Sequence, residues 1–316
     1  MRILFAAHEE RWGGFFGRIR SELPEHEFIA SGRYGFDSLK GFDVLIPTMA
    51  RVSRETLGTI DRLRLIQQAG AGLEGVDIKA ARELGIHVAN VPAGISGNAD
   101  SVAELGIYML IGLSRDIRGM AKSLSQRQMG VPLGRALSGK TIGIVGLGSV
   151  GKALIKRLKA FGVRLIAIKR SNPQKAKEEL GLDWVGGMED LPELLSRSDH
   201  VILALPLTSE TKNLMNRETF SRMKEGSFLI NLARGGVVDR DALEESLASG
   251  RLAGAGLDVF WEEPPDPNDP IFTYNVLATP HIGGGTDVSL QGMVKTVAEN
   301  LRRLEKGLEP LHLQMP

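Results

Sequence analysis

The sequence predicts an α/β protein with two domains, each built on a parallel β-sheet. Short apolar runs alternate with segments of helical periodicity along the chain, as expected for repeated strand–helix units. The chain has 316 residues, which is too long for one ordinary hydrophobic core and suits two domains. A segment that contains glycine and proline, residues 126–138, breaks the pattern and is predicted to be a loop.

In the first part of the chain, four apolar runs predict buried strands, and the segments between them predict helices. Residues 96–114 carry apolar residues at helical spacing, so we expect one long helix that crosses between the domains. The strands are expected at residues 3–7, 44–47, 65–68 and 87–90, and the shorter helices at residues 53–60 and 78–84.

A second α/β series begins at Lys140. Two α/β halves joined by one helix place a cleft between domains, which is where ligands usually bind. The strands of this series are expected at residues 141–145, 164–168, 200–204, 227–231, 253–257 and 275–278, and a closing helix at residues 287–306.

The composition excludes several classes of function. The formal net charge is only +1, so no global field attracts nucleic acid or an acidic membrane surface. The chain contains no cysteine, which excludes disulfides, thiolate metal sites and thiol nucleophiles. No apolar run approaches the roughly 20 residues that span a bilayer. We therefore expect a cytoplasmic protein with no nucleic-acid or membrane partner and no metal in its site.

A glycine-rich motif follows the first strand of the second half. Gly146, Gly148 and Gly151 form Gly-x-Gly-x-x-Gly, and a helix is expected to begin there. The first glycine allows the tight turn, the second lets a pyrophosphate approach the backbone, and the third lets helix and strand pack closely. Ser149 and Val150 would offer free N–H groups to the diphosphate. We interpret the motif as a dinucleotide-binding turn rather than as a glycine turn without a ligand.

The next expected strand ends in Lys169, Arg170 and Ser171. At about 20 residues after such glycines, an acidic residue normally holds the ribose 2′-hydroxyl of NAD. Here no carboxylate is present, and an arginine can bind a phosphate with two hydrogen bonds. The pattern therefore favours NADP, with NAD as the second choice. The alternative is that these basic residues are simply solvated at the end of a strand.

Three further segments each place one reactive side chain after an expected strand: Arg234, Glu263 and His281. Loops at the carboxyl ends of parallel strands line the ligand crevice, so these residues can converge. Arg234 can clamp a carboxylate or polarise a carbonyl oxygen. His281 can exchange a hydroxyl proton near neutral pH, and a neighbouring Glu263 would fix its tautomer. We expect hydride transfer between a nicotinamide and the 2-position of a small hydroxy or keto acid.

For any single histidine, a capping or surface role is the more common one. That role is expected for the histidines outside this set, which are His8, His26, His87, His200 and His312.

The order of these motifs resembles the D-isomer-specific 2-hydroxyacid dehydrogenase family, which includes glyoxylate and hydroxypyruvate reductases. The resemblance implies that Arg234, Glu263 and His281 are the catalytic residues. The matching motifs are the glycine turn, Leu232-Ala233-Arg234-Gly235-Gly236, Asp258-Val259-Phe260 with Glu263-Pro264, and Pro280-His281-Ile282-Gly283-Gly284.

The resemblance also implies other contacts. Asp258 would hold the nicotinamide carboxamide, and Pro206, Gly283 and Gly284 would contact the cofactor. The loop that contains Ala71 and Gly72 is similar to the one whose backbone amides take the substrate carboxylate in this family, together with the catalytic arginine and histidine. The alternative for this loop is a simple turn after a strand.

The family layout implies a flavodoxin-like substrate domain, residues 1–97 plus 286–316, into which a Rossmann domain, residues 98–285, is inserted. It also implies a homodimer. Glyoxylate and hydroxypyruvate are the leading substrates. Two alternatives stay open: a cofactor-binding sensor of the corepressor type with little turnover, and an enzyme similar to phosphite dehydrogenase. Glu263 argues against formate dehydrogenases, which pair the histidine with glutamine.

The segment Arg11-Trp12-Gly13-Gly14-Phe15-Phe16 places three aromatic residues around two glycines. It is either a mobile flap with glycine hinges or the apolar start of the first helix, anchored in the core.

Overall fold

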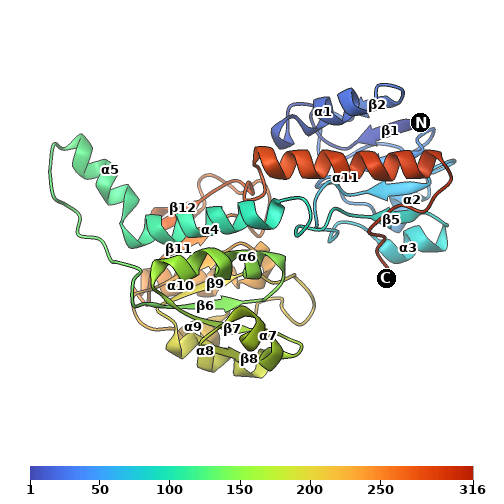
Figure 1. The fold of residues 1–316 in the computed structure, drawn as a ribbon. Helices are drawn as coiled ribbons and strands as arrows, with labels where there is room; N and C mark the ends of the chain where they lie inside the picture. The colour runs from blue at the N-terminus through green and yellow to red at the C-terminus, as the bar shows by residue number, and fades with distance from the viewer. Residues whose placement is uncertain (316) are drawn as a thin grey trace. The chain divides into compact units, whose positions relative to one another are not determined.

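The computed structural model describes residues 1–315, and the chain divides into two compact α/β units (Figure 1). The terminal unit combines Met1–Asn98 with the chain from Gly284 onward, and the central unit is Ala99–Gly283. The polypeptide therefore passes between the units twice. Within residues 1–315, no helix combines the length and the hydrophobicity that a membrane span requires.

The terminal unit contains a parallel five-stranded sheet in the order β2-β1-β3-β4-β5. This is the flavodoxin-like strand order, as predicted. The strands are β1 (Arg2–Phe5), β2 (Glu27–Ala30), β3 (Val44–Ile46), β4 (Leu65–Gln67) and β5 (His87–Ala89), and the α-helices are α1 (Phe15–Glu22), α2 (Arg54–Leu57), α3 (Ile78–Glu83) and α11 (Asp287–Glu305).

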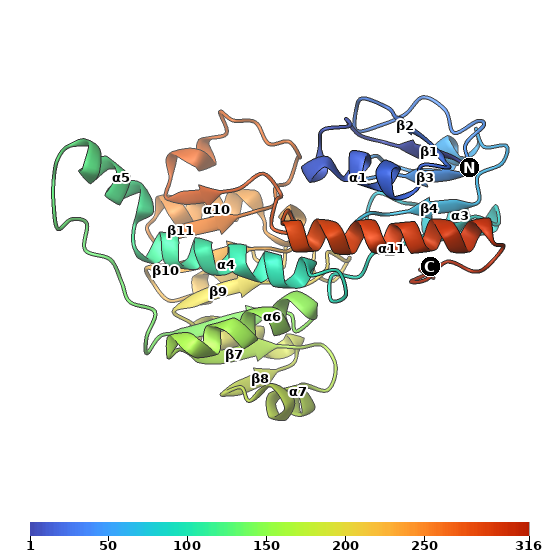
Figure 2. The same ribbon diagram turned by 45° about the horizontal axis from the view of Figure 1, so that its top comes forward.

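Both faces of this sheet are buried, which explains why its strands are almost continuously apolar. In β1, Ile3 and Phe5 pack in one core with residues of α1 and α11, whereas Leu4 packs in a second core with residues of α2 and α3. The helices α1 and α11 lie side by side (Figure 2). The C-terminal helix is thus part of the core formed by the N-terminal half-sheet.

A buried polar contact joins α11 to the sheet. Asn300 is fully buried and donates to the Gln67 side-chain oxygen at 2.7 Å and to the Leu311 carbonyl at 3.0 Å. Its own side-chain oxygen accepts from the Leu311 amide at 2.7 Å. Because every polar atom of this amide is paired, its burial carries little free-energy penalty, and it defines how α11 docks.

The central unit contains a parallel seven-stranded sheet in the order β12-β11-β10-β9-β6-β7-β8. This order is that of a Rossmann sheet with one additional strand, which confirms the predicted fold class. Its strands are β6 (Thr141–Val145), β7 (Arg164–Ile168), β8 (Trp184–Gly186), β9 (His200–Leu203), β10 (Ser227–Asn231), β11 (Leu252–Leu257) and β12 (Val276–Ala278).

Helices cover both faces of the central sheet. On one face, α4 lies close to β11 because Gly256 has no side chain: a Cβ there would be 3.0 Å from the Met109 Cβ. On the other face, α8, α9 and α10 contribute Leu194, Phe220 and Leu243 to the core. The helices are α4 (Asn98–Ser114), α5 (Ile117–Ser125), α6 (Ser149–Leu158), α7 (Pro173–Leu180), α8 (Leu191–Arg197), α9 (Arg217–Arg222) and α10 (Arg240–Ala248).

Residues 115–136, which we call the arm, extend away from the central sheet (Figure 1). The arm consists of α5 and the irregular segment that returns from it to β6. Its apolar side chains are unusually exposed: Leu124 by 73%, Met129 by 87% and Leu133 by 97%. Residues 126–138 contain no regular element, as predicted, whereas α5 was not expected.

The aromatic segment before α1 was interpreted either as a mobile flap or as a helix start anchored in the core, and its residues differ in this respect. Phe15 and Phe16 are buried and their rings pack against Phe5, so they anchor the helix in the core. Trp12 is 38% exposed, and both it and the following glycines have positive φ angles. The two phenylalanines therefore do not belong to a mobile flap.

The expectation of a capping or surface role is wrong for His200. This residue begins β9, is 2% exposed, and stacks on Phe228 with ring centroids 4.9 Å apart. Neither ring nitrogen has a hydrogen-bond partner within residues 1–315. Burial lowers the pKa of His200 from 6.5 to about 4, and this effect outweighs the opposing charge of Asp199.

This shift predicts acid sensitivity. The unfolded imidazole binds a proton below pH 6.5 and the folded one only below about pH 4, so stability is full above pH 6.5 and is lost as the pH falls between these values. When the pH is lowered from 7 to 5, we expect His200 to decrease the free energy of unfolding by about 2 kcal/mol. In His200→Leu that part of the loss should disappear in urea titrations. If His200→Leu loses as much unfolding free energy between pH 7 and pH 5 as the wild type does, the prediction is contradicted. His87→Gln is the control and should behave as the wild type.

Candidate active site

Three neighbouring strands of the central sheet carry the reactive side chains singled out above. Arg234 follows β10, Glu263 follows β11 and His281 follows β12, and these strands are adjacent in the sheet. Parallel strands all end at the same edge, so the three loops meet at the carboxyl edge of the sheet.

Glu263 and His281 form a hydrogen-bonded pair. The Nδ1 atom of His281 lies 2.7 Å from Oε2 of Glu263. The other carboxylate oxygen of Glu263 accepts from the Phe260 amide at 3.0 Å, which fixes the direction of the carboxylate. The His281 side chain is 34% exposed and that of Glu263 only 18%. The pair therefore has a half-buried acidic end and a more accessible imidazole, whose Nε2 is the atom that can exchange protons.

The electrostatic balance keeps Glu263 ionised. Burial alone would raise its pKa. The hydrogen bond and charge of His281, the Phe260 amide and the charge of Arg234 together outweigh burial and lower the pKa of Glu263 below its usual value. A charged carboxylate at Nδ1 holds a proton on that nitrogen and stabilises the imidazolium.

Asp258 holds the loop that carries His281. It directly follows β11 and is 3% exposed. Its Oδ1 accepts from the Thr279 hydroxyl at 2.6 Å and the Ile282 amide at 2.9 Å, and its Oδ2 accepts from the Gly283 amide at 2.9 Å. These bonds are made on both sides of His281 in the sequence, so one buried carboxylate positions the histidine.

This loop has a strained backbone at the histidine and no room for side chains at the two glycines. His281 has a φ of +54°, a left-handed conformation that costs roughly 1 kcal/mol for a side chain with a Cβ. A Cβ on Gly283 would lie 2.7 Å from Oδ2 of Asp258, so the glycine permits the clamp. Gly284 belongs to the terminal unit, where a Cβ would be 2.0 Å from the Asn98 side-chain nitrogen.

Arg234 is half-buried in a loop shaped by Asn231. The buried Asn231 side chain donates to the Arg234 carbonyl at 3.0 Å and accepts from the Ala233 amide at 3.0 Å. Gly235 approaches the next loop closely, because a Cβ there would be 2.1 Å from the Phe260 carbonyl carbon. Asn231 was missed in the sequence, where the only sign was a polar residue that ends an otherwise apolar strand.

The glycine turn between β6 and α6 has the geometry that its motif requires. Gly146 has a φ of +104°, and a Cβ there would be 2.5 Å from the Ala204 carbonyl oxygen. A Cβ on Gly151 would be 2.1 Å from the Gly146 carbonyl oxygen, so this glycine allows the helix to pack on the strand. These two glycines make the turn possible, and neither can be replaced without a shift of the backbone.

The second glycine of the motif faces open space. Gly148 is exposed, and a Cβ on it would meet no atom within 4 Å. It is also the N-cap residue of α6, and no side chain caps this helix. The amides of the first turn, which includes Ser149 and Val150, therefore have no side-chain cap among residues 1–315. These residues fit the diphosphate of a dinucleotide.

The basic residues after β7 and the loop after β9 lie at the same edge as the glycine turn, because both strands pair with β6. Lys169 is half-buried, and Arg170 and Ser171 are exposed. Arg170 lies 3.8 Å from Glu210, and both side chains are more than 70% exposed. Pro206 is exposed, and its carbonyl accepts from the Thr211 hydroxyl at 2.7 Å.

In the terminal unit, two side chains shape the loop that contains Ala71 and Gly72. Gln68 donates to the Gly72 carbonyl at 2.9 Å and Asn90 donates to the Ala71 carbonyl at 2.7 Å. Because both carbonyls are held in this way, the loop has a defined conformation rather than that of a loose turn. Within residues 1–315 no acceptor is found for the Ala71 or Gly72 amide. Gln68 and Asn90 had no signal in the sequence beyond being polar residues at strand ends.

Residues 107–283 match the sequence profile of a family described as "D-isomer specific 2-hydroxyacid dehydrogenase, NAD binding domain". This region covers more than half of the chain and includes the glycine turn and the residues Arg234, Glu263 and His281. The chain belongs to this family. The family places it among oxidoreductases that act on 2-hydroxy acids with a nicotinamide cofactor.

Curated relatives and solved structures agree with this assignment. Glyoxylate reductase of Pyrococcus horikoshii is 37% identical over 283 residues, or 86% of this chain and 82% of that protein. D-3-phosphoglycerate dehydrogenase of Methanocaldococcus jannaschii is 35% identical over 92% of this chain, which spans only about half of that protein (55%). A Sinorhizobium meliloti NADPH-dependent glyoxylate/hydroxypyruvate reductase, solved with NADP and malonate, has a TM-score of 0.85 and 28% identity over 99% of this chain and 96% of that chain.

The Glu263–His281 pair predicts that loss of the carboxylate charge slows the proton transfer. In Glu263→Gln the amide can still accept from the Phe260 amide but carries no negative charge beside Nδ1 of His281. We expect kcat for keto-acid reduction to fall by roughly 10- to 100-fold, because the charge that compensates the imidazolium is gone. An unchanged kcat would contradict a role of the carboxylate charge, and cofactor binding followed by fluorescence is the control.

Proposed function

We propose that this protein is an NADPH-preferring reductase of glyoxylate or hydroxypyruvate. The observation that carries the proposal is the meeting of Arg234, Glu263 and His281 at the sheet edge that also presents the glycine turn. The relatives named as glyoxylate and hydroxypyruvate reductases support the choice of substrate. The cytosolic location stays a prediction from the sequence.

In the proposed reaction, a bound nicotinamide supplies the hydride for the carbonyl carbon of the keto acid. Arg234 binds the substrate and polarises its carbonyl group. His281 donates the proton from Nε2 to the carbonyl oxygen, and the product is the 2-hydroxy acid. Glu263 holds the Nδ1 proton and compensates the positive charge of the imidazolium before transfer. In oxidation the same imidazole accepts the proton.

The amides of Ala71 and Gly72 stay our prediction for the substrate carboxylate. The bonds from Gln68 and Asn90 to the two carbonyls support it, because they fix the peptide planes of this loop. Asp258 stays a predicted partner of the nicotinamide carboxamide. Its three accepted hydrogen bonds support an additional role in positioning His281.

The function is tested with a panel of 2-keto acids, each assayed with NADPH and with NADH by the loss of nicotinamide absorbance. We expect the highest kcat/KM for glyoxylate or hydroxypyruvate. His281→Ala should lower kcat by about 100-fold or more and leave NADPH binding intact. If the wild type binds NADPH but turns over none of the acids, a sensor role would replace the proposal. If the protein oxidises phosphite with NAD and turns over none of the keto acids, an enzyme similar to phosphite dehydrogenase would be favoured instead.

We infer the preference for NADP from the end of β7. No carboxylate stands at residues 169–172 to bind a ribose hydroxyl, and Arg170 is 78% exposed. Its pair with Glu210 is long and solvated, so it is worth little and can yield to a 2′-phosphate. The S. meliloti structure with NADP shows that a relative of the same fold binds this cofactor.

Changing Lys169 and Arg170 to glutamine tests this inference. Charge-assisted hydrogen bonds to a phosphate are worth about 1.5–3 kcal/mol, so we expect KM for NADPH to rise by roughly 10- to 100-fold. KM for NADH should change little, because NADH lacks the 2′-phosphate. Equal effects on both cofactors would defeat the inference. Lys175→Gln, on exposed α7 nearby, is the matched control.

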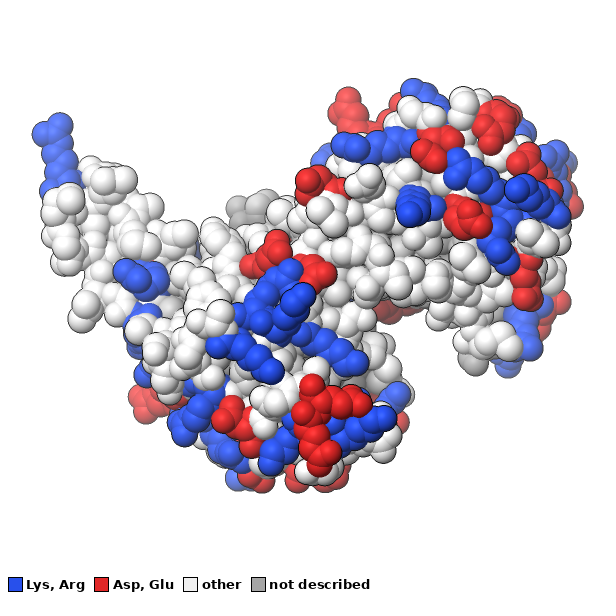
Figure 3. All heavy atoms as spheres, viewed as in Figure 1, with Lys and Arg blue, Asp and Glu red and all other residues white. Residues whose placement is uncertain are grey.

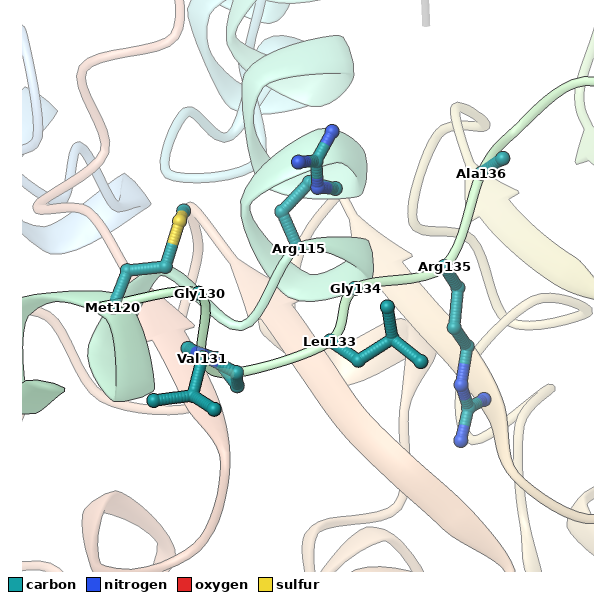
Figure 4. A pocket seen from close by; sticks show the side chains of 9 residues that line it. Arg115, Met120, Gly130, Val131, Leu133, Gly134, Arg135 and Ala136 are labelled. Carbon is teal, nitrogen blue, oxygen red and sulfur yellow. The ribbon is translucent and has the colours of Figure 1, made fainter. Parts of the chain in front are cut away.

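We also propose that a second copy of the chain covers the arm. A cavity of about 470 Å³ is formed where the returning segment passes Arg115 and Met120 (Figure 4). The face of the arm seen in Figure 3 is largely uncharged. Exposed apolar side chains in such a group are unusual on a monomer, and a two-fold dimer would bury both arms. The homodimer expected for the family is thus supported by the distribution of apolar side chains.

For the dimer, we expect sedimentation to give twice the mass of one chain. Replacing Leu124 and Leu133 by glutamate should yield monomers, because two charges would be buried in the interface. Leu84→Glu, an exposed leucine of the terminal unit, should leave the mass unchanged. A wild-type monomer at micromolar concentration would contradict the proposal.

A further inference from the structure

His26 of the terminal unit is buried without a complete set of partners. It lies in the turn between α1 and β2 and is 6% exposed as a residue and 1% as a side chain. Its Nδ1 is 3.5 Å from the Met1 amine, at the limit of a hydrogen bond. Its Nε2 has no hydrogen-bond partner within residues 1–315. The expectation of a surface or capping role is therefore wrong here as well.

The unpartnered nitrogen faces two carboxylates. Glu25 Oε1 is 4.0 Å and Glu305 Oε2 is 3.9 Å from Nε2. Both distances are too long for a hydrogen bond. Glu25 belongs to the same turn as His26, whereas Glu305 is the last residue of α11. The three ligand atoms all lie within 4.8 Å of one another, so one small cation could contact all of them.

Neighbouring cations do not neutralise these carboxylates. Arg302 pairs with Glu22 at 2.7 Å, and Arg2 pairs with Glu27 at 2.8 Å. Within residues 1–315, Glu25 and Glu305 have no lysine or arginine partner within 4.0 Å. The carboxyl end of α11, a helix of 19 residues, adds negative potential at the same place. The buried Nε2 thus faces two carboxylates and has no hydrogen-bond partner among residues 1–315.

We propose that His26, Glu25 and Glu305 bind a Zn²⁺ ion. One imidazole with two carboxylates is a ligand set that suits zinc, whereas Mg²⁺ and Ca²⁺ prefer oxygen ligands alone. Neighbouring ligands of a tetrahedral zinc ion with bonds of 2.0–2.1 Å are about 3.3 Å apart. The carboxylate oxygens, at 4.0 and 3.9 Å from Nε2 and within 4.8 Å of each other, must therefore move closer to Nε2 by roughly 0.6–0.7 Å and to each other by up to roughly 1.5 Å, which their half-exposed side chains allow. Water fills the remaining coordination position.

The ion joins segments that are far apart in the sequence. It connects the turn between α1 and β2 to the end of α11, next to the contact between these two helices. Zinc takes the lone pair of Nε2, so the proton of the imidazole then resides on Nδ1. The Met1 ammonium, 3.5 Å from Nδ1, is itself a donor and moves away when the ion binds. The site is separate from the residues proposed for catalysis, which belong to the central unit. Its role is to fix the C-terminal helix in the terminal unit.

The test is calorimetric titration of the full-length protein with Zn²⁺ after chelator treatment, together with the thermal unfolding midpoint. We expect one zinc ion per chain at this site and a higher midpoint, while Mg²⁺ at the same concentration has no effect. Glu25→Gln and Glu305→Gln should each weaken zinc binding by about tenfold or more. Both positions are half-exposed, so these variants should fold; His26→Gln should remove the site.

Two controls separate this site from other histidines. His87→Gln, on β5, removes another histidine of the terminal unit and should leave zinc binding unchanged. His281→Ala removes the other histidine–glutamate pair and should also retain the ion and the gain in midpoint. The proposal fails if the wild type binds no zinc, if Glu25→Gln and Glu305→Gln bind it as tightly as the wild type, or if binding disappears with His281→Ala.

Discussion

The geometry of the proposed catalytic site depends on the carboxylate of Asp258. This buried group accepts three hydrogen bonds from Thr279, Ile282 and Gly283, and so ties the end of β12 to the end of β11. A free chain would not keep His281 in a left-handed conformation, because other conformations are lower in energy. The bonds on both sides of the histidine compensate that strain. The backbone of His281 is thus held by a residue that does not touch its imidazole, and Glu263 then orients the ring.

Strand order provides the second constraint. The reactive residues stand far apart in the sequence, but β10, β11 and β12 are neighbours and run in parallel. Gly235 then allows its loop to touch the backbone of Phe260, and the amide of Phe260 binds Glu263. This contact links the loop of Arg234 to that of Glu263, and the positive charge of Arg234 contributes to the low pKa of the carboxylate. Topology, packing and electrostatics therefore act on the same pair of loops.

The sequence predicted the parts of this structure whose physical requirement is local. Gly146 and Gly151 could be recognised because a tight turn and a close helix approach exclude any side chain. β2 and β8, short edge strands with one buried residue each, were not predicted. The helix α5 was not predicted either. The roles of His200 and Asn231 depend on neighbours in three dimensions, which no spacing reveals.

Local and long-range contacts also differ between the two units, which therefore depend on the chain ends to different extents. The central unit is continuous in sequence, and its core is built from neighbouring strand–helix units. The terminal unit needs α11, whose Val297 and Leu301 fill the core beside Phe5. Its folding must therefore close a loop of nearly two hundred residues, an entropic penalty that grows only slowly with length. Polar contacts such as Asn300–Gln67 oppose that penalty by holding the late helix on the early sheet.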